Sequence, residues 1–257
     1  MAAGEDLGFM RIGFLSDIHG NREALDACLA QARRQGVDRL VFLGDLVGYG
    51  ADPVYVVDRV AELRETQDAI VLLGNHDAAA VTADTTGMND YAREAILWTH
   101  AELDRAQIDF LRGLPMSFEE EDRLYVHSDA TAPEQWRYIT DAAEAERSLR
   151  ATSKRLTFCG HVHRPALYHM APSKPAIVFK PQAGTPIPLM GSRKWLLVQG
   201  AVGQPRDENP AASWGVLDTD KCEFTFLRTS YDIETAAGKI HAAHLPQILA
   251  ARLYIGR

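Results

Sequence analysis

The sequence lacks several features that would place it in a specialised class of proteins. Its three cysteines, Cys28, Cys159 and Cys222, are odd in number and far apart with no CxxC pair, which argues against a disulfide framework or a thiolate zinc knuckle. The longest apolar run is the five residues 69–73, which is too short to cross a bilayer. The first six residues show no signal-peptide pattern. We therefore expect a cytoplasmic protein with no membrane partner.

Net positive charge is also absent. Lysine and arginine total 27 against 35 acidic residues, which gives a formal net charge of −8 with histidine taken as neutral. This balance argues against a broad basic surface that would hold nucleic acid.

The composition is otherwise that of an ordinary globular protein. The 257 residues are 46% hydrophobic and 24% charged. The sequence contains no internal repeat, low-complexity tract or evident linker. We therefore predict one domain over residues 1–257, with a motif-bearing core at about 10–165 and a second sheet and C-terminal helices at about 166–257.

The first third of the chain alternates between apolar strands and amphipathic helices. The predicted strands are 11–15, 40–43 and 69–73, and the predicted helices are 22–35 and 54–64. Each strand ends in a polar string, and Asp17, Asp45 and Asn75 follow one another at intervals of 28 and 30 residues, about one βαβ unit. Parallel strands are therefore expected, and their carboxyl ends bring the polar strings together at one edge of the sheet.

The rest of the chain continues this alternation and then changes character. Helices are predicted at 90–114 and 141–150, strands at 123–126 and 156–159, and a final helix at 233–250 interrupted at Pro246. Short apolar segments separated by proline and glycine lie at 177–179, 195–198, 214–217 and 224–227. They indicate a second, largely antiparallel sheet, with Trp195 and Trp214 packed between the two sheets.

Seven polar side chains follow the predicted strands. They are Asp17, His19, Asp45, Asn75, His127, His161 and His163. Each polar string alone is equally typical of a turn or a helix cap. Together they supply nitrogen and oxygen ligands and no thiolate, which favours Mn, Fe, Zn or Co. Seven ligands are too many for one metal and would suit two metals that share one carboxylate.

The order and spacing of these strings resemble the motifs of the calcineurin-like metallophosphoesterases over roughly residues 10–165. The resemblance rests on Asp17-Ile18-His19-Gly20-Asn21, Gly44-Asp45, Gly74-Asn75-His76-Asp77, His127 and Gly160-His161-Val162-His163. Val202–Asp207 also resembles a segment of a bacterial subgroup of predicted phosphoesterases. The resemblance implies an α/β fold, a four-layer α/β/β/α sandwich of two mixed β-sheets flanked by helices.

The resemblance also implies two metal sites. Asp17, His19 and His163 would hold one ion, Asn75, His127 and His161 would hold the other, and Asp45 would bridge them. The ions would be divalent or mixed-valence transition metals, with Mn, Fe or Zn expected. A hydroxide held between two ions about 3.5–4 Å apart would attack the phosphorus atom.

Two further residues have roles implied by the resemblance. His76 would protonate the leaving alkoxide, and Asp77 would hold the imidazole in the right tautomer and favour its charged form. The alternative is that His76 merely packs near the metals.

The segment after Asp45 departs from named relatives. Tyr49 stands where protein serine/threonine phosphatases and diadenosine tetraphosphate hydrolases carry a phosphate-binding arginine, and Asp77 replaces their usual glutamate. Both substrate classes are therefore disfavoured. Arg22 and Arg206 could instead offer bidentate contacts to phosphate, and Tyr49 could stack on a ring, although a surface or packing role fits all three equally well.

These observations predict a two-metal phosphoesterase that hydrolyses a phosphomonoester or phosphodiester bond of a small phosphorylated or nucleotide-like substrate. One alternative is a nuclease of the same superfamily, against which the net charge counts. The other is a catalytically silent metal-binding scaffold, against which the presence of His76 and all seven ligand positions counts. The native metals, the ester class and the oligomeric state stay open.

Overall fold

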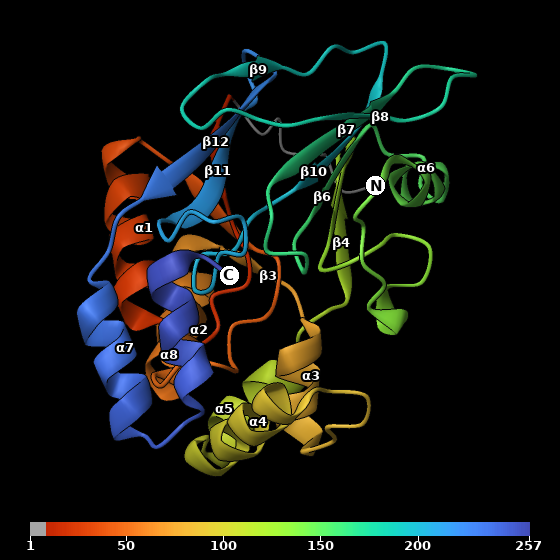
Figure 1. Cartoon of the computed structure of the whole chain (residues 1–257). Helices are drawn as coiled ribbons and strands as arrows, with labels where there is room; N and C mark the ends of the chain where they lie inside the picture. Colours follow the sequence, from red (N-terminus) through yellow and green to blue (C-terminus); the bar gives the residue numbers. More distant parts are fainter. Residues whose placement is uncertain (1–8) are drawn as a thin grey trace.

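The computed structural model describes residues 9–257. Within that range, twelve strands form two six-stranded sheets and eight α-helices surround them (Figure 1). Each sheet combines parallel and antiparallel pairs. The predicted four-layer α/β/β/α sandwich is confirmed. None of the helices described has the length and apolar character needed to span a bilayer.

The first sheet has the strand order β3-β2-β1-β11-β12-β9. Its strands are β1 (Arg11–Leu15), β2 (Arg39–Phe42), β3 (Ile70–Val71), β9 (Ile187–Pro188), β11 (Ala212–Asp218) and β12 (Glu223–Thr229). The strands β1, β2 and β3 are parallel, as predicted, with Gly13 opposite Leu40 and Val41 opposite Ile70. Their carboxyl ends therefore lie at the same edge of the sheet.

The second sheet has the strand order β4-β5-β6-β10-β7-β8. Its strands are β4 (Ser117–Glu120), β5 (Arg123–Val126), β6 (Leu156–Cys159), β7 (Ala166–Met170), β8 (Ile177–Phe179) and β10 (Lys194–Val198). The central strands β5, β6 and β10 are parallel, and β4, β7 and β8 pair antiparallel to their neighbours.

The strands after Pro165 do not form a sheet of their own, so that part of the prediction is wrong. Strands β7, β8 and β10 extend the sheet that contains β5 and β6, whereas β9, β11 and β12 complete the first sheet. The strand β11 is buried on both faces and lies against β1. A strand that is buried on both faces has to lie inside a sheet, between other strands. A local pattern of apolar residues does not specify which sheet that is.

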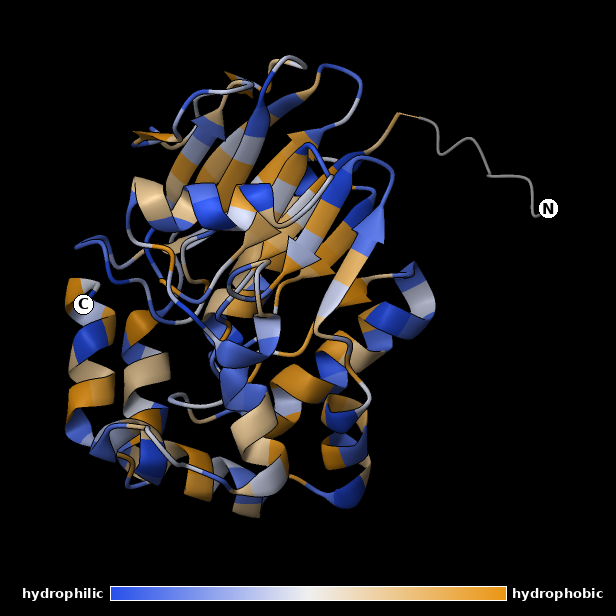
Figure 2. Cartoon of the chain, turned by 90° about the vertical axis from the view of Figure 1, so that its right-hand side faces the viewer, coloured by the Kyte–Doolittle hydropathy of each residue, from blue (hydrophilic) through white to orange (hydrophobic). Residues whose placement is uncertain are grey.

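Helices flank the two sheets (Figure 1). They are α1 (Arg22–Arg34), α2 (Pro53–Gln67), α3 (Asn75–Thr82), α4 (Asp90–Glu102), α5 (Arg105–Arg112), α6 (Ala142–Arg150), α7 (Ile233–Ala242) and α8 (Gln247–Ile255), with a 3-10 turn at Pro133–Gln135. Helices α1 and α2 pack on the first sheet, and α6 packs on the second. Strands and helices alike carry both hydrophobic and hydrophilic residues (Figure 2).

The two sheets pack face to face through an aromatic core. Phe14 of β1 stacks on Phe158 of β6 with ring centroids 4.0 Å apart, and Phe224 of β12 lies 5.7 Å from Phe158. Trp195 belongs to this core, as predicted. Trp214 does not, because it packs with the helices on the other face of the first sheet.

Replacing Phe158 with alanine is expected to lower the free energy of unfolding by about 3–5 kcal/mol, because it removes a fully buried ring from the inter-sheet core. Urea denaturation followed by circular dichroism measures this change. Phe179→Ala is the matched control: this ring on β8 is 49% exposed, so its loss should cost about 0.5 kcal/mol or less. Equal losses for both variants would contradict the assignment of the core.

Candidate metal centre

The carboxyl ends of five strands, three from the first sheet and two from the second, meet at one place. The side chains that follow them are Asp17, His19, Asp45, Asn75, His127, His161 and His163. Six of the seven are buried, with exposures of 5% or less, and Asn75 is half-buried. The structure therefore brings together all seven residues that were singled out in the sequence.

Hydrogen bonds between loops fix these residues in place. The backbone N–H of His161, in the loop that follows β6 of the second sheet, donates to Asp17 Oδ2 at 3.0 Å. Asp17 itself lies in the loop that follows β1 of the first sheet. The N–H of His19 donates to the carbonyl of Asp45 at 3.0 Å, and that of Gly203 donates to the carbonyl of Asp17 at 2.9 Å. Asp17 thus connects the loops of both sheets.

Six residues of this site have a left-handed backbone. They are Asp17, His19, Asp45, Tyr49, His161 and His163, with φ between 49° and 67°. This conformation is uncommon for residues other than glycine and carries steric strain. Its concentration here indicates that the surrounding fold imposes the direction of these side chains.

His19 and His163 direct ring nitrogens at each other. The Nδ1–H groups of the two rings donate to the carbonyls of Val47 and Gln204, at 3.0 and 2.7 Å. A neutral imidazole protonated on Nδ1 keeps a lone pair on Nε2, and the two Nε2 atoms are 3.1 Å apart. Asp17 Oδ1, which is buried without a hydrogen-bond partner, lies 3.3 Å from the Nε2 atom of His163. Burial lowers the pKa of His19 well below its ordinary value, so this group of acceptors fits a cation.

A second group of ligand atoms lies around His127. Its Nδ1–H donates to the carbonyl of Leu43 at 2.8 Å, which directs Nε2 toward Asn75 Oδ1 at 3.2 Å and Asp45 Oδ2 at 3.4 Å. Backbone carbonyls that hold the far nitrogen of a histidine are typical of metal sites, because they fix the tautomer and the orientation of the ring.

His161 completes this second group with the opposite ring nitrogen. Its Nε2 donates to the carbonyl of Trp136 at 2.9 Å, and its ring stacks on Tyr138 with centroids 4.2 Å apart. Burial lowers the pKa of His161 to about 3. The imidazole is therefore neutral, and one ligand atom from each of Asp45, His127 and His161 lies within 4.8 Å of the others.

Asp45 lies between the two groups. Its Oδ2 atom is 3.4 Å from His127 Nε2 and 3.7 Å from His19 Nε2, while Oδ1 accepts the backbone N–H of His76 at 2.8 Å. Burial opposes its ionisation, yet His127 and His76 hold the pKa of Asp45 well below its usual range. Despite burial, Asp45 in turn raises the pKa of His127 to about 9. One ionised carboxylate oxygen therefore faces both groups.

His76 is buried at the same edge, at the start of α3. Its ring lies against His19 and Tyr49, with centroids 4.8 and 4.5 Å away, and its Nδ1 has no hydrogen-bond partner. Burial lowers the pKa of His76 to about 4. The side chain is thus an unattached imidazole directed into the site.

Asp77 does not hold this imidazole, contrary to expectation. Its Oδ1 accepts the backbone N–H groups of Leu46 and Val47, at 2.8 and 3.1 Å, and its Oδ2 accepts that of Gly74 at 3.0 Å. At the third position of α3 the carboxylate satisfies buried backbone donors, as in a capping box. Asp77 therefore fixes the loop that carries Asp45.

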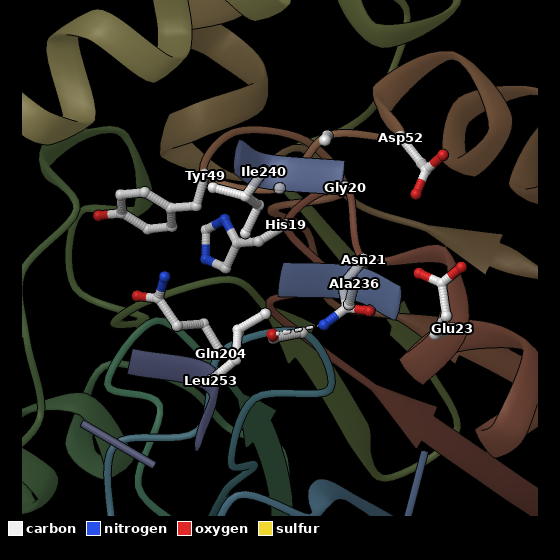
Figure 3. Close-up of a pocket in the computed structure, with 13 residues that line it drawn as sticks. His19, Gly20, Asn21, Glu23, Tyr49, Asp52, Gln204, Ala236, Ile240 and Leu253 are labelled. Atoms are coloured by element: carbon white, nitrogen blue, oxygen red, sulfur yellow. Dashed lines mark hydrogen bonds between the residues drawn. The ribbon is translucent and has the colours of Figure 1, made fainter. Parts of the chain in front are cut away.

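The three candidate substrate contacts differ in position. Tyr49 lies in the site, with its ring 4.6 Å from that of His19 (Figure 3), and the guanidinium of Arg206 lies 5.6 Å from the Tyr49 ring. Arg22 instead contacts Tyr55 at 4.2 Å and Asp26 at 3.5 Å. The structure therefore brings Tyr49 and Arg206, but not Arg22, to the cluster.

Sequence reasoning missed the aromatic wall beside His161. Trp136 and Tyr138 line a groove that also contains Asn75 and His161. The segment that carries them has neither helical nor strand periodicity. The only feature of the sequence that could have indicated this wall is the presence of two aromatic residues in an irregular stretch. The carbonyls that orient the histidines could not be found from side-chain identity at all.

Comparison with known proteins identifies the family. The family model of the calcineurin-like phosphoesterase superfamily domain matches residues 10–222. The chain belongs to this superfamily. As a member, it is a hydrolase of the metal-dependent phosphoesterase class, which acts on phosphoester bonds.

Three known proteins resemble the chain along almost its whole length. An uncharacterized protein of Methanocaldococcus jannaschii is 32% identical over 252 residues, which cover 96% of this chain and 98% of the relative. The crystal structure of a metallophosphoesterase from Sphaerobacter thermophilus superposes with a TM-score of 0.85 at 34% identity and covers 97% of this chain and 100% of that one. A hypothetical protein of Pyrococcus horikoshii shares the fold with a TM-score of 0.78 at 18% identity, over 96% and 98% of the two chains.

Gly160→Ala is expected to lower the metal content by about one ion per chain, the ion of the group that contains Asp17, while the protein stays folded. A Cβ atom at this position would lie 1.8 Å from Ser16 Oγ and 2.6 Å from Asp17 Oδ2, so the Asp17 carboxylate must move. Inductively coupled plasma mass spectrometry measures the number of metal ions per chain and so tests this effect. Gly191→Ala is the control, because a Cβ there meets no atom within 4 Å. Normal metal content in Gly160→Ala would contradict the role given to Asp17.

Proposed function

We propose that the chain is a two-metal phosphoesterase. Asp17, His19 and His163 hold one ion, Asn75, His127 and His161 hold the other, and Asp45 contributes to both. The observation that carries this proposal is the set of buried acceptors: His19 Nε2 and His163 Nε2 are 3.1 Å apart, and Asp45 Oδ2 lies within 3.7 Å of a histidine of each group. The two facing ring nitrogens repel each other unless a cation lies between them, and the Asp45 carboxylate supplies negative charge beside them.

The donor set limits the metals. Imidazole nitrogen and carboxylate or amide oxygen, without thiolate, suit Mn, Fe or Zn. When bound, such a pair of ions supplies Lewis-acid activation of water and neutralises the charge of the phosphoryl oxygens. The orientation of the ligands comes from the chain, through the carbonyls of Val47, Gln204, Leu43 and Trp136.

The reaction is the hydrolysis of a P–O ester bond. An oxygen of water forms a new bond to phosphorus, the bond from phosphorus to the leaving oxygen breaks, and the products are a phosphate and an alcohol. His76 donates a proton to the leaving oxygen, and the proton that the attacking water releases passes to solvent, from which His76 is protonated again. Burial keeps the pKa of His76 low in the free protein, and an anionic phosphoester placed beside it favours the protonated form.

The substrate that we propose is a small phosphorylated or nucleotide-like molecule. Arg206 and Tyr49 lie beside the cluster and would contact it, while Trp136 and Tyr138 flank the groove next to His161. The net charge of −8 disfavours a long nucleic acid, whose affinity depends on many basic contacts.

The first test combines metal content with turnover. Protein purified without chelator is expected to contain about two metals per chain and to hydrolyse p-nitrophenyl phosphate or bis-p-nitrophenyl phosphate in the presence of Mn²⁺. His76→Asn should lower kcat by about 10²–10⁴-fold, because it removes a general acid, while metal content stays the same.

His241→Asn is the matched control, since it changes an exposed histidine on α7 and should leave both readings unchanged. Full metal content with no turnover of either ester would support a binding scaffold. Strong, salt-sensitive affinity for DNA would support a nuclease. A His76→Asn variant with full activity would remove this residue from the mechanism.

A further inference from the structure

Arg206 lies beside the candidate metal centre, and among residues 9–257 its side chain has no carboxylate partner. Its backbone N–H donates to the carbonyl of His163 at 3.1 Å, and its Nη2 donates to the Gln204 side chain at 3.0 Å. Its Nε is buried and makes no hydrogen bond. The carboxylate next to it in sequence, Asp207, is bound to Arg228. A buried N–H of a guanidinium that is left unbonded in this way is costly unless an anion reaches it.

A second arginine lies close by on α8. Arg252 is half-buried, and within residues 9–257 its side chain forms no ion pair. Burial, and after it the positive charge of Arg206, lowers the pKa of Arg252. Sequence patterns gave no reason to choose Arg252, which lies far along the chain from every metal-binding motif.

Hydrogen bonds hold α8 against the loop that carries Arg206. The backbone N–H of Glu208 donates to the carbonyl of Gly256 at 2.9 Å, one helical turn beyond Arg252. Leu253, the neighbour of Arg252, lines the same pocket as Gln204 and Tyr49 (Figure 3). The two arginines are therefore presented by segments with fixed relative positions, and neither reaches the site on a free loop.

We propose that Arg206 and Arg252 form a subsite for a second phosphate group of the substrate. This inference rests on the proposed function, in which the scissile phosphoryl group lies at the metal ligands. The residues that would hold the two metal ions, together with His76, would account for the charge of that group. Two guanidinium groups on adjoining segments, neither of them in an ion pair within residues 9–257, match a substrate with an additional phosphate, because arginine binds phosphate through paired N–H groups. Arg252 is then a specificity-determining residue.

The test measures binding separately from turnover. Isothermal titration calorimetry on Mn²⁺-loaded His76→Asn protein, with no free metal, compares AMP with two probes that carry a second phosphate, ADP and adenosine 3′,5′-bisphosphate. At least one of these two probes is expected to bind about tenfold more tightly than AMP, since charge-assisted contacts of this kind are worth such a factor. Adding Arg252→Gln should bring that ratio close to one and change the affinity for AMP less than about twofold.

Arg34→Gln serves as the matched control, because it removes one exposed positive charge at the last turn of α1, the end of the helix away from the site. It should leave the ratio unchanged, and thermal melting should show that both variants are folded. Equal affinities for all three nucleotides, or an equal loss for AMP and the two other probes in Arg252→Gln, would overturn the proposal. Failure of the proposed function is seen separately, as absent metal or absent turnover of p-nitrophenyl phosphate by the unmodified protein.

Discussion

Mutual repulsion among buried acceptor atoms is the constraint around which this edge of the molecule is organised. The ring nitrogens of His19 and His163 face each other, and the carboxylates of Asp17 and Asp45 lie beside them with almost no contact with water. Such a group disperses unless its surroundings hold it. Here backbone carbonyls hold the rings, the N–H of His161 holds Asp17, and the parallel strands hold the loops.

Much of this arrangement could be predicted from local sequence. The first three strands each combine an apolar run with a polar string, and their spacing of about one βαβ unit gives the parallel order that places Asp17, Asp45 and Asn75 at one edge. The histidines from β5 and β6 could be added because metal ligands are recognised by residue type. At these positions an apolar strand is followed directly by residues of metal-binding type, so a short segment of sequence is sufficient to predict both the strand and the ligand.

The features that sequence could not predict depend on contacts between distant segments. Strand β11 joins β1 because it is buried on both faces, which its own residues do not reveal. Asp77 accepts hydrogen bonds from backbone N–H groups and not from His76, because the loop after β2 lies against its carboxylate. Arg22 lies at the start of α1 as expected, yet the ring of Tyr55 and the carboxylate of Asp26 hold its side chain elsewhere.

The left-handed backbone at the site has a consequence for how this protein could be stabilised. Each non-glycine residue in that conformation costs the folded state about 1 kcal/mol or more, and six of them occur together here. Glycine or asparagine at these positions would relieve strain but would remove a ligand or a ring. Selection for heat resistance alone would therefore act against the metal site, and a stabilised variant has to gain its stability elsewhere, in the inter-sheet core or on the helices.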